Sequence, residues 1–178
     1  MEKGKSDIDK RQFSRVEAFI PLSYRLVPEQ ELAFLKSRIL DQTYPKNPKV
    51  LPETADSALY GSLCILNAKL DQILHLLTLR NEGFNALSSR LVNISGAGLC
   101  FTTPEKFAEG DIIEIKTFLS PHKNRALCLY GMIIASEERA EGYRLSLSFV
   151  QMDDSVREEI VKFVFERERE LLREKRGS

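Results

Sequence analysis

The stretch RLVNISGAGLCF, residues 90–101, has two apolar β-forming runs separated by a polar, glycine-containing corner. Leucine, valine and isoleucine lead into the corner, and Leu-Cys-Phe leads out of it. Within the corner, Asn93 is followed by Ser95, Gly96 and Gly98. A tight turn needs fewer such residues than this. The corner therefore either bends the chain with support from its own side chains or also holds a ligand.

Strand-like segments with a hydrophobic period of two surround this corner. In one of them Leu145, Leu147 and Phe149 alternate with polar residues, as on a half-buried strand. An earlier run contains Pro21, which indicates an edge strand or a bulge. The predicted strands are 16–27, 84–93, 97–102, 111–119, 125–136 and 143–150. Such short strands, separated by glycine and proline turn signals, predict a mainly β fold, a six-stranded antiparallel barrel that is closed or nearly closed.

Three other segments have helical patterns. Residues 28–40 begin with proline and acidic residues and carry an apolar stripe, which predicts a helix. The last segment begins near Asp153 or Asp154 and leads into a charged tail, 166–178. Residues 56–79 carry leucine or isoleucine at the 4-3-4-3-4 spacing of a heptad stripe: Leu59, Leu63, Leu66, Leu70, Ile73 and Leu77. The sequence therefore predicts a long inserted heptad helix and a C-terminal helix beside the barrel.

The composition suits a single domain with a real core, since 43% of the 178 residues are hydrophobic. The 26 basic and 26 acidic residues balance, which does not support a general DNA-binding surface. The charged N-terminus has no signal-peptide pattern, and no apolar run is long enough to span a membrane. The three cysteines, Cys64, Cys100 and Cys128, match no zinc or disulfide pattern. Cys100 and Cys128 lie in apolar runs, so we expect these two to be reduced core residues. These features favour a cytoplasmic protein.

Residues suited to catalysis are few. His75 lies on the heptad helix and His122 lies in a turn, and neither has a partner at metal-ligand spacing. The chain contains no phosphate-binding P-loop, no dinucleotide fingerprint, no zinc-protease motif and no nucleophile elbow. We therefore expect no catalytic residue, no metal and no cofactor, and predict that the protein is not an enzyme.

Two features point to ligand binding. The first is RQFSR, in which Arg11 and Arg15 are four residues apart and follow Lys10. Guanidinium groups bind phosphate oxygens in pairs and read the O6/N7 edge of guanine. The same pattern is also compatible with a solvated tail, and Arg169 and Arg173 repeat the spacing near the C-terminus.

The second feature is the corner itself, Asn93-x-Ser95-x-x-Gly98. Asparagine offers both a donor and an acceptor, and serine adds a small hydroxyl. Glycine permits close approach to the backbone and can adopt positive φ. The alternative is a corner stabilised by its own asparagine or serine, with no ligand.

Together and in this order, the two features make the chain resemble a PilZ domain, the bacterial cyclic di-GMP receptor module. That family carries R-x-x-x-R before its first strand and [D/N]-x-S-x-x-G on the next strand of a six-stranded barrel with a C-terminal helix. The similarity covers roughly 8–27 and 84–165. The chain departs from the family in the long segment 28–83 between the motifs.

The resemblance implies a site and a division of the chain. Cyclic di-GMP would lie between the basic arm and the corner, held by Lys10, Arg11, Arg15, Asn93, Ser95, Gly96 and Gly98. The parts would be a flexible arm 1–15, a barrel with helix 16–27 and 84–165, a helical insertion 28–83 and a charged tail 166–178. An exposed heptad stripe is unfavourable in water, so residues 56–79 either pack on the barrel or pair with copies of themselves. We favour self-association, as a dimer or tetramer.

We therefore expect a cyclic di-GMP receptor or adaptor that oligomerises and acts on an unknown downstream protein. One alternative is a PilZ-like scaffold that binds no nucleotide and acts through protein–protein interaction. Another is an enzyme on a similar split barrel, for example one that holds a flavin.

Overall fold

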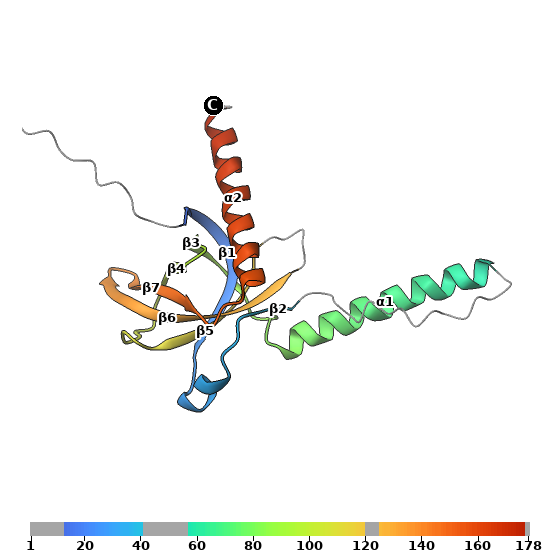
Figure 1. Ribbon diagram of the computed structural model, residues 1–178, viewed down its shortest axis with the longest axis horizontal. Coiled ribbons are helices and arrows are strands. Elements are labelled where there is room, and N and C mark those ends of the chain that lie inside the picture. Colours follow the sequence, from blue (N-terminus) through green and yellow to red (C-terminus); the bar gives the residue numbers. More distant parts are fainter. Residues whose placement is uncertain (1–12, 41–56, 120–124, 177–178) are drawn as a thin grey trace, which may run out of the picture.

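The computed structural model describes residues 13–40, 57–119 and 125–176 (Figure 1). In chain order its elements are β1 (Arg15–Leu26), the 3-10 helix η1 (Glu29–Phe34), β2 (Arg38–Leu40), α1 (Ser57–Asn81), β3 (Ser88–Ser95), β4 (Gly98–Thr103), β5 (Ile112–Phe118), β6 (Ala126–Arg139), β7 (Gly142–Val150) and α2 (Asp154–Arg176). The predicted strands, the heptad helix and the C-terminal helix are therefore confirmed.

A closed antiparallel barrel forms the centre of the structure. Its strands follow the order β6-β5-β1-β3-β4-β7, and β7 pairs with β6 to complete the ring. Short β2 is added outside this ring, on the first residues of β6. Pro21 lies where β1 changes its partner from β3 to β5, so a missing N–H costs little there. The prediction of a six-stranded barrel is confirmed, while β1 is an inner strand and not an edge strand.

The barrel interior is filled by alternating apolar residues from all six strands. On β1 these are Val16, Ala18, Ile20 and Leu22, all of which are buried. The first turns of α2 close one end of the barrel, where α2 contacts β1 and β3 (Figure 1). The residues that α2 buries in this core are Val156, Ile160 and Val164. Each such side chain contributes about 1.5–3 kcal/mol through burial.

Helix α2 continues well beyond its buried part. Charged pairs such as Arg167–Glu170 lie along its outer turns. The segment predicted as a charged tail is helical as far as Arg176. Its charges therefore lie on a helix surface that extends away from the barrel (Figure 1).

The prediction of a helix over residues 28–40 is wrong. Only Glu29–Phe34 are helical, as a 3-10 turn, and Arg38–Leu40 pair with β6 as strand β2. The physical reason is tertiary: β7 covers β6 only from Tyr130 onward, which leaves the first residues of β6 with an open edge. Ser37 is fully buried there and accepts a hydrogen bond from the Tyr130 N–H at 3.2 Å.

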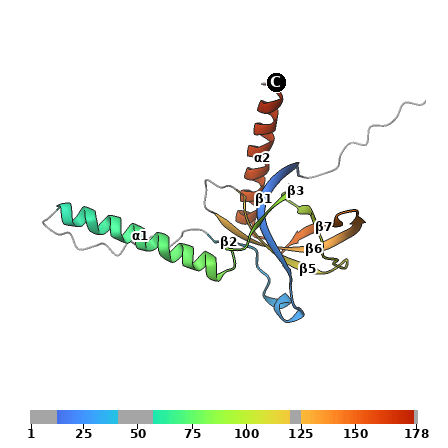
Figure 2. The ribbon, with the colours of Figure 1, turned by 180° about the vertical axis from the view of Figure 1, so that it is seen from behind.

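Helix α1 projects away from the barrel and touches it only near its C-terminal end (Figures 1 and 2). That end is a Schellman motif, because the Phe84 N–H donates to the Leu79 carbonyl at 2.9 Å and the Gly83 N–H to the Arg80 carbonyl at 3.0 Å. Gly83 has φ 82°, which glycine adopts without strain. Leu79 and Phe84 then pack together with Ala126 of β6. The helix is thus anchored at one end and otherwise free of the barrel.

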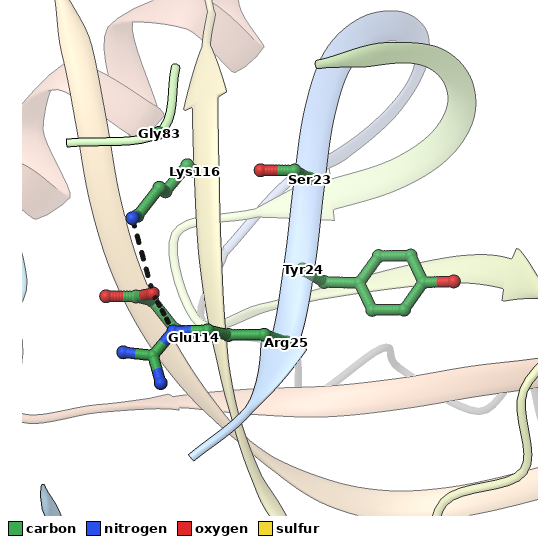
Figure 3. Close-up of a pocket in the computed structure, with 6 residues that line it drawn as sticks. All are labelled: Ser23, Tyr24, Arg25, Gly83, Glu114 and Lys116. Atoms are coloured by element: carbon green, nitrogen blue, oxygen red, sulfur yellow. Dashed lines mark hydrogen bonds and ion pairs between the residues drawn. The ribbon is translucent and has the colours of Figure 1, made fainter. Parts of the chain in front are cut away.

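A buried carboxylate, Glu114 of β5, organises the outer surface between β1 and α1 (Figure 3). It accepts a hydrogen bond from Arg25 Nε at 2.6 Å and pairs with Lys116 at 3.5 Å. Its other oxygen accepts from Tyr130 at 3.2 Å and from the Cys128 thiol at 3.4 Å. Burial alone would raise the pKa of Glu114, but the Arg25 hydrogen bond and the two cations outweigh it and lower the pKa. Burial, followed by the Glu114 charge, raises the pKa of Cys128 to about 11.

Replacing Glu114 with glutamine should destabilise the protein by about 1–3 kcal/mol at neutral pH, because the cations lose a buried charged partner. The folded-state pKa of Glu114 is depressed, so its stabilising charge is fully present above the ordinary value of 4.5 and is lost as the pH falls through the folded-state pKa. Urea unfolding of both proteins between pH 3 and pH 7 measures this. A stability difference that stays constant over that range would contradict the assignment.

Candidate functional site

The outer face of β1, β3, β4 and β7 carries four of the predicted site residues, Arg15, Asn93, Ser95 and Gly98. In the first row across this face, Arg15 is the cross-strand partner of Ser95, which pairs with Gly98, which pairs with Ser148. The start of β1 therefore lies directly beside the polar corner. The helices between the two motifs in sequence do not separate them in space.

A second row lies one pleat further along the same face. It runs from Glu17 through Asn93 and Cys100 to Ser146. Asn93 is half-buried and points outward, since its neighbours on β3 point into the core. The two rows together form an open polar surface on the outside of the barrel, not an enclosed cleft.

Arg15 and Asn93 have unused hydrogen-bonding capacity on this surface. Within the described residues, neither the Arg15 guanidinium nor the Asn93 amide has a side-chain hydrogen bond or ion pair. A guanidinium carries five N–H donors, and an amide offers both donors and an acceptor. These two side chains can therefore bind a polar, anionic ligand without breaking an existing contact.

Ser95 and Gly98 are used by the corner itself. The Ser95 hydroxyl accepts from the Ala97 N–H at 3.3 Å and donates to the Gly98 carbonyl at 3.4 Å, and it is buried. A Cβ on Gly98 would lie 2.2 Å from the Leu147 carbonyl oxygen of β7. Gly98 does not have positive φ, so close approach of a neighbouring strand is the reason for glycine at this position. Both residues shape the corner and bring β3, β4 and β7 together.

Gly96 contacts the arm and α2. A Cβ there would lie 2.8 Å from the Phe13 ring and 2.9 Å from Val161 of α2. Arg157 of α2 donates to the Gly96 carbonyl at 2.6 Å and lies over the Phe13 ring, with 5.7 Å to the ring centroid. Phe13, the middle residue of RQFSR, is therefore packed between the corner and α2. Lys10 and Arg11 lie outside the described residues.

A polar pocket of about 190 Å³ lies on a different part of the barrel surface, lined by Ser23, Tyr24, Arg25, Gly83, Glu114 and Lys116 (Figure 3). Its charged groups already pair with one another, and Arg25 also pairs with Glu31 at 2.7 Å. This pocket forms the junction between the barrel and the end of α1. None of the predicted site residues lines it.

Comparison with known families agrees with this architecture. The family profile of the PilZ domain matches residues 74–166, just over half of the chain. The chain belongs to the PilZ family. The resemblance inferred from the two motifs is thereby confirmed, and the matched range includes the Asn93 corner but begins after Arg15.

One solved PilZ structure is similar along most of its length. It is a pathogenic protein from Xanthomonas campestris, described as a tetrameric PilZ domain that self-assembles through an unusual helical bundle. The TM-score is 0.56 at 17% sequence identity, over 90% of this chain and 91% of the other. At this identity the likeness concerns the fold. A search of curated proteins finds no match.

Two features of this outer face were not predicted from the sequence: the exposure of Cys100 and the position of Arg144. Cys100 was predicted to lie in the core, but it is half-exposed on the outer face because β4 buries its other side. Arg144 of β7 lies across the same face and donates from Nε to the Cys100 sulfur at 3.1 Å. Period-two alternation places Arg144 outside, yet nothing local in the sequence indicates that β4 is its neighbour.

None of the helices in the described ranges combines the length and hydropathy of a membrane-spanning helix.

The two glycines Gly98 and Gly61 should respond to alanine with opposite signs. Gly98→Ala should destabilise the fold by about 2 kcal/mol or more, because its methyl group meets the main chain of β7. Gly61→Ala, on an open face of α1 with nothing within 4 Å, should stabilise by about 0.5–1 kcal/mol through helix propensity. Denaturant unfolding of both variants checks this. Equal stability of Gly98→Ala and the wild type would show that β7 does not approach as described.

Proposed function

We propose that this PilZ protein is a cyclic di-GMP receptor that binds the dinucleotide on the outer face of β1, β3 and β4. The observation that carries the proposal is that the cross-strand pairing of Arg15 with Ser95 places Arg15 beside Asn93. Neither the Arg15 guanidinium nor the Asn93 amide has a side-chain partner among the described residues. A cationic fork and an amide next to each other match an anionic guanine nucleotide. The family to which the chain belongs supports the same ligand class.

Each predicted residue has a chemical role in this proposal. The Arg15 guanidinium binds a phosphate or the O6/N7 edge of guanine, and Asn93 bonds to a base edge. Ser95 and Gly98 contribute by holding the corner in shape, and Gly96 gives the arm room beside α2. Lys10 and Arg11 would close over the ligand from the other side.

We also propose that α1 assembles the protein into a tetramer. Leu66 and Leu70 of the heptad stripe are each 57% exposed. Burying a side chain of this size contributes about 1.5–3 kcal/mol, so a covered stripe is strongly favoured. Tyr60, Leu74 and Leu76 are also exposed and widen the apolar surface beyond that of a simple two-helix contact. The helical bundle reported for the Xanthomonas campestris protein supports this arrangement.

In this scheme the protein acts as a non-enzymatic adaptor in the cytoplasm. Cyclic di-GMP binding next to Phe13 would change the surface near α2, which a downstream protein would contact. The insertion 28–83 then serves assembly, and the barrel serves recognition.

A second candidate function is an adaptor that binds no nucleotide. The specific observation in its favour is that the Ser95 hydroxyl and Gly98 are both explained by the corner and by β7. In addition, the carboxylate of Glu17 lies on the same face as Asn93 and opposes binding of an anion. Direct measurement of binding distinguishes the two functions.

The wild-type protein should bind cyclic di-GMP in titration calorimetry, and Arg15→Ala should weaken binding by about 10- to 100-fold through loss of a charge-assisted contact. Asn93→Ala should weaken it by a smaller factor. The matched control is Arg169→Ala, which removes an arginine with the same R-x-x-x-R spacing from exposed helix surface. Absence of binding by the wild type would remove the receptor function and leave the nucleotide-free adaptor.

Light scattering after size exclusion should give a tetramer for the wild type and smaller species for Leu66→Lys/Leu70→Lys. Two buried lysines at the centre of a helical bundle are unfavourable, whereas lysines outside the stripe are not. Ala68→Lys/Gln72→Lys adds the same charge at exposed positions of α1 outside the stripe and should leave the assembly intact. A monomeric wild type, or equal dissociation of both variants, would contradict assembly through this stripe.

A further inference from the structure

Arg144 is an exposed residue of β7 whose side chain lies back over the neighbouring strand. Its Nε donates to Cys100 Sγ on β4 at 3.1 Å. Cys100 is in turn the cross-strand partner of Asn93. Adjacent strands are about 4.8 Å apart, so the guanidinium lies about one strand from the Asn93 side chain. The outer face that carries Arg15 and Asn93 therefore continues onto β7, a strand that contains neither motif.

A purely structural role for Arg144 would use a different partner. Its cross-strand partner on β6 is Glu137, and opposite charges at such positions ordinarily form an ion pair. Glu137 instead pairs with Arg139 of its own strand. Arg144 turns the other way and is held by a thiol, which is a weak acceptor. Arg144 therefore does not form the cross-strand ion pair that usually explains an exposed arginine on a strand.

The terminal nitrogens of Arg144 retain their binding capacity. Among the described residues, none accepts a hydrogen bond from Nη1 or Nη2. The hydrogen bond to Cys100 is the main cause that raises the pKa of Arg144, and the Glu137 and Glu17 carboxylates raise it further. The geometric evidence for the direction of the guanidinium is the hydrogen bond to Cys100, because Cys100 is the cross-strand partner of Asn93.

We propose that Arg144, oriented by Cys100, is a further ligand-binding residue that contacts a phosphate of the dinucleotide from the β7 side of the face. This inference rests on the proposed function and extends it to a strand outside both motifs. Arg15 approaches the ligand from β1 and Arg144 from β7, with Asn93 between them. A cyclic dinucleotide carries two phosphates, so one guanidinium on each side matches its charge. Cys100 acts as a positioning residue.

The test is titration calorimetry of cyclic di-GMP with wild type, Arg144→Gln and Arg144→Lys. Arg144→Gln should weaken binding about tenfold, and Arg144→Lys should restore part of that loss because the positive charge remains. Arg169→Gln is the matched control, since it removes an exposed arginine from the outer turns of α2, away from Arg144 and its neighbours. Melting temperatures should remain unchanged, because both arginines are exposed.

Cys100→Ala tests the positioning role. It should weaken binding about two- to threefold in the wild type and have no further effect in Arg144→Gln, because a coupled pair is not additive. Equal loss in both backgrounds would overturn the positioning role.

The outcomes separate the two proposals. If the wild type binds and Arg15→Ala weakens binding, but Arg144→Gln binds as tightly as the wild type, the Arg144 contact is overturned and the receptor function stands. If the wild type binds no cyclic di-GMP, the receptor function is overturned and the Arg144 contact with it.

Discussion

The pairing of β1 with two different strands is the constraint on which the rest of the structure depends. The first half of β1 pairs with β3 and the second half with β5, so this single strand joins the two halves of the barrel. Its register is strongly specified, because a shift of one residue would turn Val16, Ala18, Ile20 and Leu22 out of the core. That register also places Arg15 opposite Ser95. The position of Arg15 is therefore a consequence of core burial.

The long insertion is compatible with this pairing because it leaves the barrel and returns at nearly the same place. Strand β2 attaches to the open edge of β6, and the Schellman motif at the end of α1 turns the chain back into β3. Leu79 and Phe84 seal this junction against β6. The Glu114 cluster covers the adjoining surface with paired charges (Figure 3). Most of α1 thereby projects away from the barrel (Figure 2).

The candidate site combines two kinds of residue with different physical roles. The Ser95 hydroxyl forms hydrogen bonds within the corner, and Gly98 permits the close approach of β7. Both residues therefore already have their partners in the fold. Arg15 and Asn93 are oriented by the strands but have no side-chain partners among the described residues. Rigid residues thus shape a surface on which unpaired groups remain available. This division is what a preorganised binding face requires.

The sequence by itself determined the features that depend on local pattern. Period-two alternation located the barrel strands, the heptad spacing located α1, and the run of polar and glycine residues located the corner at 93–98. These patterns are readable because each residue's face depends only on its near neighbours along the chain. The order of the two motifs was also sufficient to indicate the PilZ family.

Only the tertiary structure decided the features that depend on strand neighbours. The open edge of β6 made residues 38–40 a strand in spite of their helical pattern. The approach of β7 explains Gly98, and the orientation of β4 turned Cys100 outward beneath Arg144. Strand order and register bring together residues that are far apart in sequence, and one-dimensional periodicity contains no information about which strands will be adjacent.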